Sequence, residues 1–203
     1  MTSIVTSATG PATSARRSKL VAGLITLACV VLATIGLRAS EDPNDFQLVD
    51  GTLGQTVVLN EGEVVVDDVQ VGNALLTNGD ISASTPGMFV VVSVTVSAPG
   101  RDRLLINTSE LTSGDRTYKT YSSLDSISAV PGFESTGDLV YEVDPKRIDD
   151  LTIDLWNAEV VHGYYQRVRV PLGITARNAD AFRARAGVPI VEPILSPTTR
   201  VIP

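Results

Sequence analysis

The chain has 203 residues and a mass of 21.5 kDa, with 43% hydrophobic, 19% charged and 5% aromatic residues. This composition excludes a wholly disordered or collagen-like chain and leaves room for one domain with appendages. A single cysteine and a single histidine exclude a disulfide framework and a zinc site built from cysteine and histidine.

The charge is distributed unevenly along the chain, although its formal total is -7. Residues 1–38 hold four basic residues and no acidic residue, which gives +4. Residues 39–203 hold the other 12 basic residues and all 23 acidic residues, which gives -11. A domain this acidic repels phosphate backbones, so we predict no nucleic-acid partner.

The N-terminal region is predicted to anchor the chain in a membrane. Residues 1–19 are rich in serine, threonine and alanine and show no periodic pattern, which indicates a disordered tail. Residues 20–37, LVAGLITLACVVLATIGL, contain 18 residues without a charge. As a helix this run spans about 27 Å, at a rise of about 1.5 Å per residue, which is enough to cross a bilayer.

The charges on either side of residues 20–37 predict the orientation of this span. Three basic residues precede it, and Arg38 is followed by Glu41 and Asp42. The positive-inside rule therefore places the N-terminus in the cytoplasm and residues 39–203 outside the cell. We predict a single-pass protein of the plasma membrane.

Two other interpretations of this region remain open. A cleavable signal peptide would need small residues before the cleavage point, and Leu37-Arg38-Ala39 meets this requirement poorly. A lipoprotein would need an aliphatic residue where Thr26 stands before Cys29, and the apolar run continues past that cysteine. We therefore interpret Cys29 as a small packing or lipid-facing residue.

From Gln55 onward, the pattern becomes that of short strands separated by turns. Residues 38–54, which include Pro43 and Gly51, are predicted to be a polar linker. The predicted strands are residues 55–59, 63–71, 88–98, 104–111, 117–121, 126–130, 137–143, 151–156 and 164–174. No helical period appears among them, so residues 55–175 are predicted to form an all-β, antiparallel β-sandwich.

The alternation of side chains predicts which strand faces are buried. In Met88–Ala98 the set Val90, Val92, Val94 and Val96 is predicted to face a second sheet, and the set that begins with Phe89 and Val91 to be partly solvated. In residues 63–71 the alternating set is Val65, Asp67, Val69 and Val71. Residues 151–156 alternate Leu151, Ile153 and Leu155 against Thr152, Asp154 and Trp156. In residues 164–174 the aliphatic residues are predicted to point inward, and Arg167 and Arg169 outward.

Residues 176–203 are predicted to be a short helix followed by a proline-rich tail. The helix is expected at Ala179–Ala186, with Asn178 as its N-terminal cap and Gly187 after its end. The tail, VPIVEPILSPTTRVIP, is apolar but contains four prolines, which favours an extended conformation. It is expected to pack along the sandwich, with presentation to a partner as the alternative.

Several of these motifs resemble the immunoprotective-extracellular, immunoglobulin-like family of bacterial proteins. The matching runs are Gly54–Asp68 (GQTVVLNEGEVVVDD), Gly87–Val92, Asp115–Tyr118 and Pro131–Val143 (PGFESTGDLVYEV). The resemblance covers about residues 50–175, and Ala98-Pro99-Gly100 replaces the family's usual Asn-x-Gly turn. It implies an immunoglobulin-like sandwich outside the cell and no catalytic residue.

No residue pattern selects a catalytic or metal site. His162, the sole histidine and so the base that a Ser–His–Asp triad would need, lies at a predicted strand end or hairpin, and the chain has no Gly-x-Ser-x-Gly elbow; we interpret it as a surface or loop residue. The pair Asp67-Asp68 would chelate calcium only if a bulge turned both carboxylates to one side, and Asp149-Asp150 lacks a calcium-loop pattern. Trp156 is interpreted as a packing residue. We predict no catalytic residue, no cofactor, no metal ligand and no small-molecule substrate.

These observations predict a membrane-anchored, extracytoplasmic binding or accessory protein of the bacterial cell envelope that acts by protein–protein interaction. The first alternative is a freely secreted immunoglobulin-like domain, released by signal-peptide cleavage. The second alternative is an envelope hydrolase that uses unidentified carboxylates.

Overall fold

Strands dominate the computed structural model, which describes residues 46–121, 126–158, 165–191 and 193–202. The described elements are β1 (Phe46–Asp50), β2 (Thr56–Val58), β3 (Glu63–Thr77), β4 (Asp80–Ser97), β5 (Leu104–Ile106), β6 (Thr108–Ser113), β7 (Arg116–Tyr118), β8 (Ile127–Ala129), β9 (Phe133–Val143), β10 (Thr152–Trp156), β11 (Tyr165–Pro171), α2 (Ala179–Arg185), β12 (Ile190–Val191) and β13 (Thr198–Val201).

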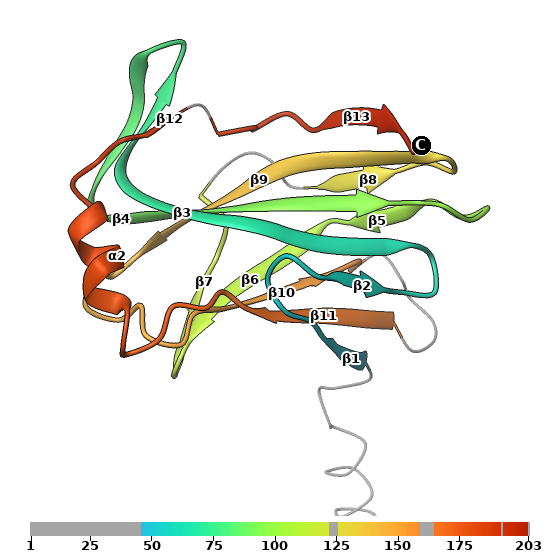
Figure 1. Ribbon diagram of the computed structural model, residues 1–203, viewed down its shortest axis with the longest axis horizontal. Coiled ribbons are helices and arrows are strands. Elements are labelled where there is room, and N and C mark those ends of the chain that lie inside the picture. Colours follow the sequence, from blue (N-terminus) through green and yellow to red (C-terminus); the bar gives the residue numbers. More distant parts are fainter. Residues whose placement is uncertain (1–45, 122–125, 159–164, 192, 203) are drawn as a thin grey trace, which may run out of the picture. The chain divides into compact units, whose positions relative to one another are not determined.

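The strands form two main sheets that pack face to face as a β-sandwich (Figure 1). The five-stranded sheet has the order β1-β11-β10-β6-β7, and the six-stranded sheet has the order β12-β3-β4-β9-β13, with β2 also paired to β3. A third, two-stranded sheet of β5 and β8 buries Leu104, Ile106, Ile127 and Ala129 in the same core. The predicted β-sandwich is therefore confirmed.

The core between the sheets matches the predicted strand faces. Val90, Val92, Val94 and Val96 of β4 are all fully buried, opposite Leu111, Ile153, Leu155, Val168 and Val170 of the five-stranded sheet. Because alternate residues of a strand point to opposite faces, one buried position sets the orientation of the whole strand. The period of the apolar residues was sufficient to predict this layer.

Two strand pairs are parallel, which the prediction of an antiparallel sandwich did not include. β1 pairs with β11 in the register Phe46↔Tyr165 to Asp50↔Arg169, and β12 pairs with β3. β1 lies inside residues 38–54, which were predicted to be linker. The prediction was wrong there because five residues show too little alternation, and the partner strand lies more than a hundred residues away.

β3 and β4 form a hairpin that is longer than the sequence pattern predicted. The predicted strands ended at residue 71 and began again at residue 88, whereas the two strands meet at a two-residue turn. Asn78 and Gly79 form this turn with φ values of 55° and 84°, the left-handed conformations that a tight hairpin turn requires. An Asn-Gly pair is a strong local hairpin signal that the strand prediction did not use.

A β-bulge between Val66 and Asp68 changes which side chains of β3 face the core. Val64 and Val66 are buried before the bulge, and Val69 and Val71 contact the core after it. The predicted alternating set of Val65, Asp67, Val69 and Val71 is therefore wrong in its first half. The single extra residue reverses the alternation, which a strict period of two does not reproduce.

The predicted strand at residues 104–111 is two strands in different sheets. β5 pairs with β8, whereas β6 pairs with β10 and β7. Asn107 separates them; its backbone N–H donates to the Trp156 carbonyl at 3.3 Å, and its side-chain Oδ1 accepts from the Ala158 N–H at 2.7 Å. These two hydrogen bonds hold the chain at the point where it changes sheets.

The C-terminal strap, formed by β12, residues 193–197 and β13, crosses the outer face of the six-stranded sheet (Figure 1). It pairs with β3 at one edge and with β9 at the other. Ile190 and Leu195 pack on Phe89, Val91 and Val140, which are at most 2% exposed. The tail thus packs along the sandwich as expected, and the prediction that Phe89 and Val91 are partly solvated was wrong because the strap covers them.

Asp138 of β9 holds the strap at two points. Its backbone N–H donates to the Ile194 carbonyl at 2.9 Å, and its Oδ2 accepts from the Ile194 N–H at 2.7 Å. Its Oδ1 accepts from the Ser93 hydroxyl at 2.5 Å. The 6% exposed carboxylate therefore has partners for both oxygens.

Helix α2 begins and ends close to the predicted positions, but Asn178 does not cap it with its side chain. That side chain accepts from the Thr175 N–H at 2.7 Å and donates to the Gly173 carbonyl at 2.8 Å, which stabilises the preceding turn instead. Within the described parts of the chain, no helix is long and apolar enough to cross a membrane. The predicted span at residues 20–37 lies outside these parts.

Tyr141 of β9 connects the two sheets through the core. It is fully buried, and its hydroxyl donates to the Ser109 hydroxyl of β6 at 2.7 Å. Burial raises the pKa of the Tyr141 hydroxyl far above its ordinary value, and the hydrogen bond with Ser109 acts in the opposite direction. The folded chain therefore keeps this proton at a pH where the unfolded chain releases it.

Replacing Tyr141 with phenylalanine is expected to remove part of the alkaline sensitivity of the fold. Because the folded pKa is raised, stability is intact below about pH 10 and falls above it, by up to about 1.4 kcal/mol per pH unit. Tyr141→Phe should lose about 1 kcal/mol at pH 7 and lack this slope. Urea unfolding from pH 8 to 11 measures how the free energy of unfolding of this variant changes with pH. The control is Tyr121→Phe, which alters a half-exposed tyrosine. Equal slopes in the two variants would contradict the expectation.

Candidate functional site

The outer face of the five-stranded sheet carries a cluster of charged and aromatic side chains. This outer-face cluster consists of Phe46 and Leu48 of β1, Glu110 of β6, Asp154 and Trp156 of β10, and Arg167 and Arg169 of β11. The strand register brings these residues together from four neighbouring strands. Arg167 lies opposite both Leu48 and Trp156, and Asp154 lies opposite both Glu110 and Arg169.

Asp154 is the centre of the cluster and is only 1% exposed. Its Oδ1 and Oδ2 accept from Nε and Nη2 of Arg169, both at 2.9 Å, in a bidentate pair. Nη2 of Arg167 lies 3.0 Å from Asp154 Oδ2 and donates to Glu110 Oε2 at 3.1 Å. A buried carboxylate needs such charged partners, because its desolvation is otherwise unfavourable.

The hydrogen bond with Asp154 raises the pKa of the Arg169 guanidinium, and partial burial opposes this only in part. Arg169 therefore keeps its positive charge throughout the accessible pH range. Its side chain is 42% exposed, so part of the guanidinium remains available to solvent or to a partner. The cluster thus presents a charge that Asp154 holds in place.

Arg167 lies between two aromatic rings. Its guanidinium carbon is 4.0 Å from the centroid of the Trp156 ring and 5.1 Å from that of Phe46. Both distances are within the range of cation–π attraction. Trp156 is half-buried by this stacking, so the prediction of a packing residue is correct, and its packing partner is an arginine.

Sequence reasoning selected none of these residues as a site, but its alternation pattern grouped some of them on common strand faces. Alternation predicted that Arg167 and Arg169 point outward and grouped Asp154 with Trp156 on one face of the neighbouring strand, and the observed register agrees with both. It missed the burial of Asp154 and the contribution of Phe46, because β1 was predicted to be linker. The charge pattern offered one usable signal: an aspartate alternates with apolar residues on one strand, and two arginines alternate on the next.

The other residues considered for chemistry lie apart from the cluster. Asp67 is the extra residue of the β3 bulge and Asp68 follows it, and Asp67 Oδ2 accepts from the Thr95 hydroxyl at 2.7 Å. Asp149 forms an ion pair with Arg183 at 3.1 Å, and Asp150 has a φ of 62°. His162 and Cys29 lie outside the described residues. Among the residues that the structure describes, no three His, Cys, Asp or Glu side chains gather as metal ligands.

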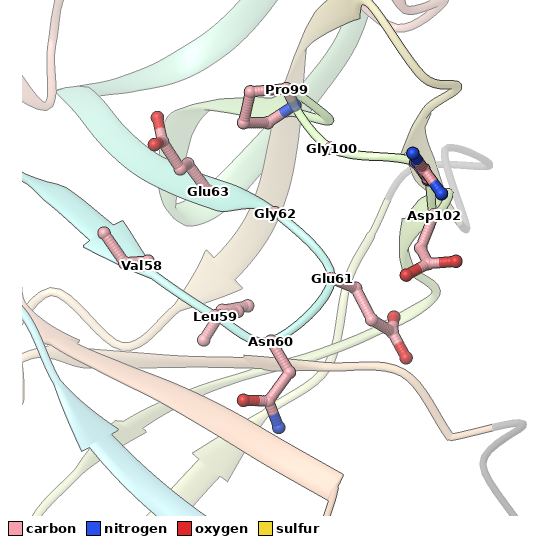
Figure 2. A pocket seen from close by; sticks show the side chains of 10 residues that line it. Val58, Leu59, Asn60, Glu61, Gly62, Glu63, Pro99, Gly100 and Asp102 are labelled. Carbon is pink, nitrogen blue, oxygen red and sulfur yellow. The ribbon is translucent and has the colours of Figure 1, made fainter.

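A small hollow lies where the β2–β3 turn meets the chain after β4 (Figure 2). It has a volume of about 160 Å³ and is lined mainly by Val58 to Glu63 and Pro99 to Asp102. Gly62 is required here, because a Cβ would lie 2.3 Å from the Ser97 carbonyl oxygen. In Figure 2 the side chain of Glu63 points away from those of Glu61 and Asp102, so these carboxylates do not converge on one point.

In comparisons with known proteins, the chain is similar to solved structures but matches no family model and no curated sequence. The yjhA protein from Bacillus subtilis is similar, with 16% identity and a TM-score of 0.45 over 59% of this chain and 98% of that chain. An uncharacterized β-sandwich protein from Clostridium difficile 630 is similar with 8% identity and a TM-score of 0.40, over 62% of this chain and 96% of that chain.

Proposed function

We propose that this chain is a single-pass membrane protein whose extracytoplasmic β-sandwich binds another protein of the bacterial cell envelope through the outer-face cluster. The charge-free run at residues 20–37 and the charges around it support the anchor and its orientation. The anchor would join the sandwich at β1, because residues 38–45 alone lie between it and Phe46.

The proposed binding face is supported by a difference between the outer faces of the two sheets. The outer face of the six-stranded sheet is covered by the C-terminal strap, whereas no described element packs over the outer-face cluster. The cluster is rich in tryptophan, phenylalanine and arginine, the residue types that are enriched where proteins bind each other. Leu48 adds an aliphatic side chain that is 39% exposed.

The chemistry of the cluster supports a protein partner with both apolar and acidic groups. Leu48 and the edge of Trp156 would contact apolar side chains, and the exposed part of Arg169 would receive a carboxylate. Asp154 holds Arg169 in one orientation before binding, which lowers the entropy that the complex must lose. Such preorganised arginine and tryptophan side chains are typical of residues that dominate binding energy.

We further propose that the sandwich is an immunoglobulin-like member of the immunoprotective-extracellular family. The motifs behind that resemblance lie at structurally constrained positions. Gly87 precedes the buried part of β4, and a Cβ there would lie 2.8 Å from the Val143 carbonyl oxygen. Gly132, in the turn before β9, has a φ of 83°.

The test is affinity purification of the native chain from detergent-solubilised membranes, with the intact mass of the bait measured. An uncleaved bait of 21.5 kDa that recovers one envelope protein in stoichiometric amount is expected. Leu48→Glu should lower this recovery at least tenfold, or about 1.4 kcal/mol. The matched control is Val201→Glu, which alters a 66% exposed aliphatic residue on β13 of the other sheet and should leave recovery unchanged.

Two results of this experiment would contradict separate parts of the proposal. A bait that begins near residue 40 and appears in the medium would contradict the anchor and support a secreted domain. Equal recovery with Leu48→Glu and Val201→Glu would contradict the outer-face cluster as the binding surface, even where the anchor is intact.

A further inference from the structure

A groove separates the edge of β3 from helix α2 and the turn that follows it. Its volume is about 330 Å³. Asp68, Val69, Gln70 and Val71 of β3 line one side, and Phe182, Arg185, Val188, Pro189 and Ile190 line the other. The groove lies on the six-stranded sheet and contains no residue of the outer-face cluster, so it is a separate site.

The β3 side of the groove is a strand edge with a gap in its pairing. β2 pairs with this edge at Glu63 to Val65, and β12 pairs with it at Leu75 and Leu76. Between these positions, no strand within the described residues pairs with the edge. A strand edge of this kind presents backbone N–H and C=O groups that an added strand can bind.

Both ends of the gap are closed by close backbone approaches. At one end the Gly54 N–H donates to the Val66 carbonyl at 2.8 Å. At the other end the Val188 carbonyl oxygen lies 2.4 Å from the position that a Cβ on Gly72 would occupy. The open stretch is therefore residues 67–71, or about 17 Å at about 3.4 Å per residue.

The helix side of the groove supplies apolar contacts and a cation. Phe182 packs partly on the core, and Val188 is 59% exposed at the rim. The Arg185 guanidinium lies 5.8 Å from the centroid of the Phe182 ring. Arg183 pairs with Asp149 and Asp180, whereas Arg185 forms no ion pair with any described residue. Arg185 is exposed and lines the groove, so an anionic group in the groove could pair with it.

We propose that this groove binds an extended segment of a partner protein, which adds a strand to β3 between β2 and β12. The segment has about five residues, with an apolar side chain against Phe182 and Val188 and a carboxylate that pairs with Arg185. The same edge already accepts two short strands of this chain, one antiparallel and one parallel, so its geometry suits such an addition. Main-chain hydrogen bonds provide affinity, and the pocket side chains select the sequence.

Selection of peptides on the full-length chain in detergent tests this proposal. The probe is a phage-displayed library of random hexapeptides, and the expected product is a set with alternating apolar residues and one Asp or Glu. Arg185→Glu should weaken binding of a selected peptide at least tenfold, and replacing its acidic residue by lysine should restore binding to that variant. Arg177→Glu, which alters an exposed arginine before α2, should leave the affinity unchanged.

Hydrogen exchange with a selected peptide locates the bound strand. Increased protection at residues 67–71 is expected, together with loss of binding when alternate peptide amides are N-methylated. Failure to enrich any peptide, or binding that is insensitive to Arg185→Glu, would overturn the proposal. So would protection confined to the outer-face cluster, or a groove filled by a second copy of this chain, seen as a stable dimer.

Discussion

Asp154→Ala is expected to lower the free energy of unfolding by about 3–5 kcal/mol, one of the two largest effects that we expect. The change removes the single carboxylate that satisfies Arg169 in a bidentate pair and also contacts Arg167. Arg167, whose side chain is 16% exposed, would then keep its charge beside the rings of Trp156 and Phe46 with Glu110 as its one remaining ion partner among the described residues. A partly buried charge that loses its partner is strongly unfavourable.

Urea unfolding at pH 7 measures this effect, and Asp50→Ala is the matched control. Asp50 also faces the charge of Arg169 but is exposed, so its loss should change stability by less than about 0.5 kcal/mol. The double variant Asp154→Leu with Arg169→Met should recover much of the lost stability, because a buried ion pair is often replaceable by apolar residues. An Asp154→Ala effect no larger than that of Asp50→Ala would contradict a structural role for the buried carboxylate.

Ending the chain at Gly187 is expected to remove most of the stability of the fold. The deletion takes away the C-terminal strap and exposes Phe89, Val91 and Val140, which are at most 2% exposed. At about 1.5–3 kcal/mol for each buried side chain, the loss is roughly 5–9 kcal/mol. That equals much of the total stability of an ordinary domain, about 5–15 kcal/mol.

Circular dichroism during urea unfolding and binding of a hydrophobic dye check this expectation. A chain that ends at Ile202 is the control and should behave as the intact protein. Asp138→Ala is expected to fall between the two, with a loss of about 1–3 kcal/mol, because it removes the hydrogen bonds to Ser93 and to the Ile194 N–H but leaves the apolar contacts. Truncation at Gly187 with a loss below about 1 kcal/mol would show that the strap is not part of the cooperative fold.

The strap and the outer-face cluster explain why the two outer faces of the sandwich differ. Both sheets have apolar or charged side chains on their outer surfaces, and backbone pairing between strands does not satisfy these side chains. On the six-stranded sheet, Phe89 and Val91 are covered by Ile190 and Leu195 from the end of the chain. On the five-stranded sheet, Arg167 and Arg169 instead pair with Asp154, and Arg167 also contacts the rings of Trp156 and Phe46.

Predictions from the sequence were most accurate where one physical requirement determined the outcome. The alternation of valines in β4 predicted the buried layer, because those residues had to leave water together. The helix predicted at Ala179–Ala186 also lies close to its observed bounds, Ala179–Arg185. These features depend on residues that are close together in the sequence, so a local sequence pattern is enough to predict them.

The errors occurred where distant segments decide the structure. β1 has little strand character of its own, and its partner β11 lies more than a hundred residues later in the chain. The burial of Asp154 depends on two arginines of a neighbouring strand, and that of Phe89 depends on a tail a hundred residues away. No local pattern contains these pairings.

The sequence by itself determined the all-β class, the inward faces of β4 and β11, the charge-free run at residues 20–37 and the outward positions of Arg167 and Arg169. Periodicity and charge are local properties, and burial of one face follows from them. Only the tertiary structure decided the parallel pairings, the course of the strap, the ion pairs of Asp154 and the gap in the β3 edge. Each of these depends on which strands become neighbours, and that choice follows from packing of the whole chain, not from any single segment.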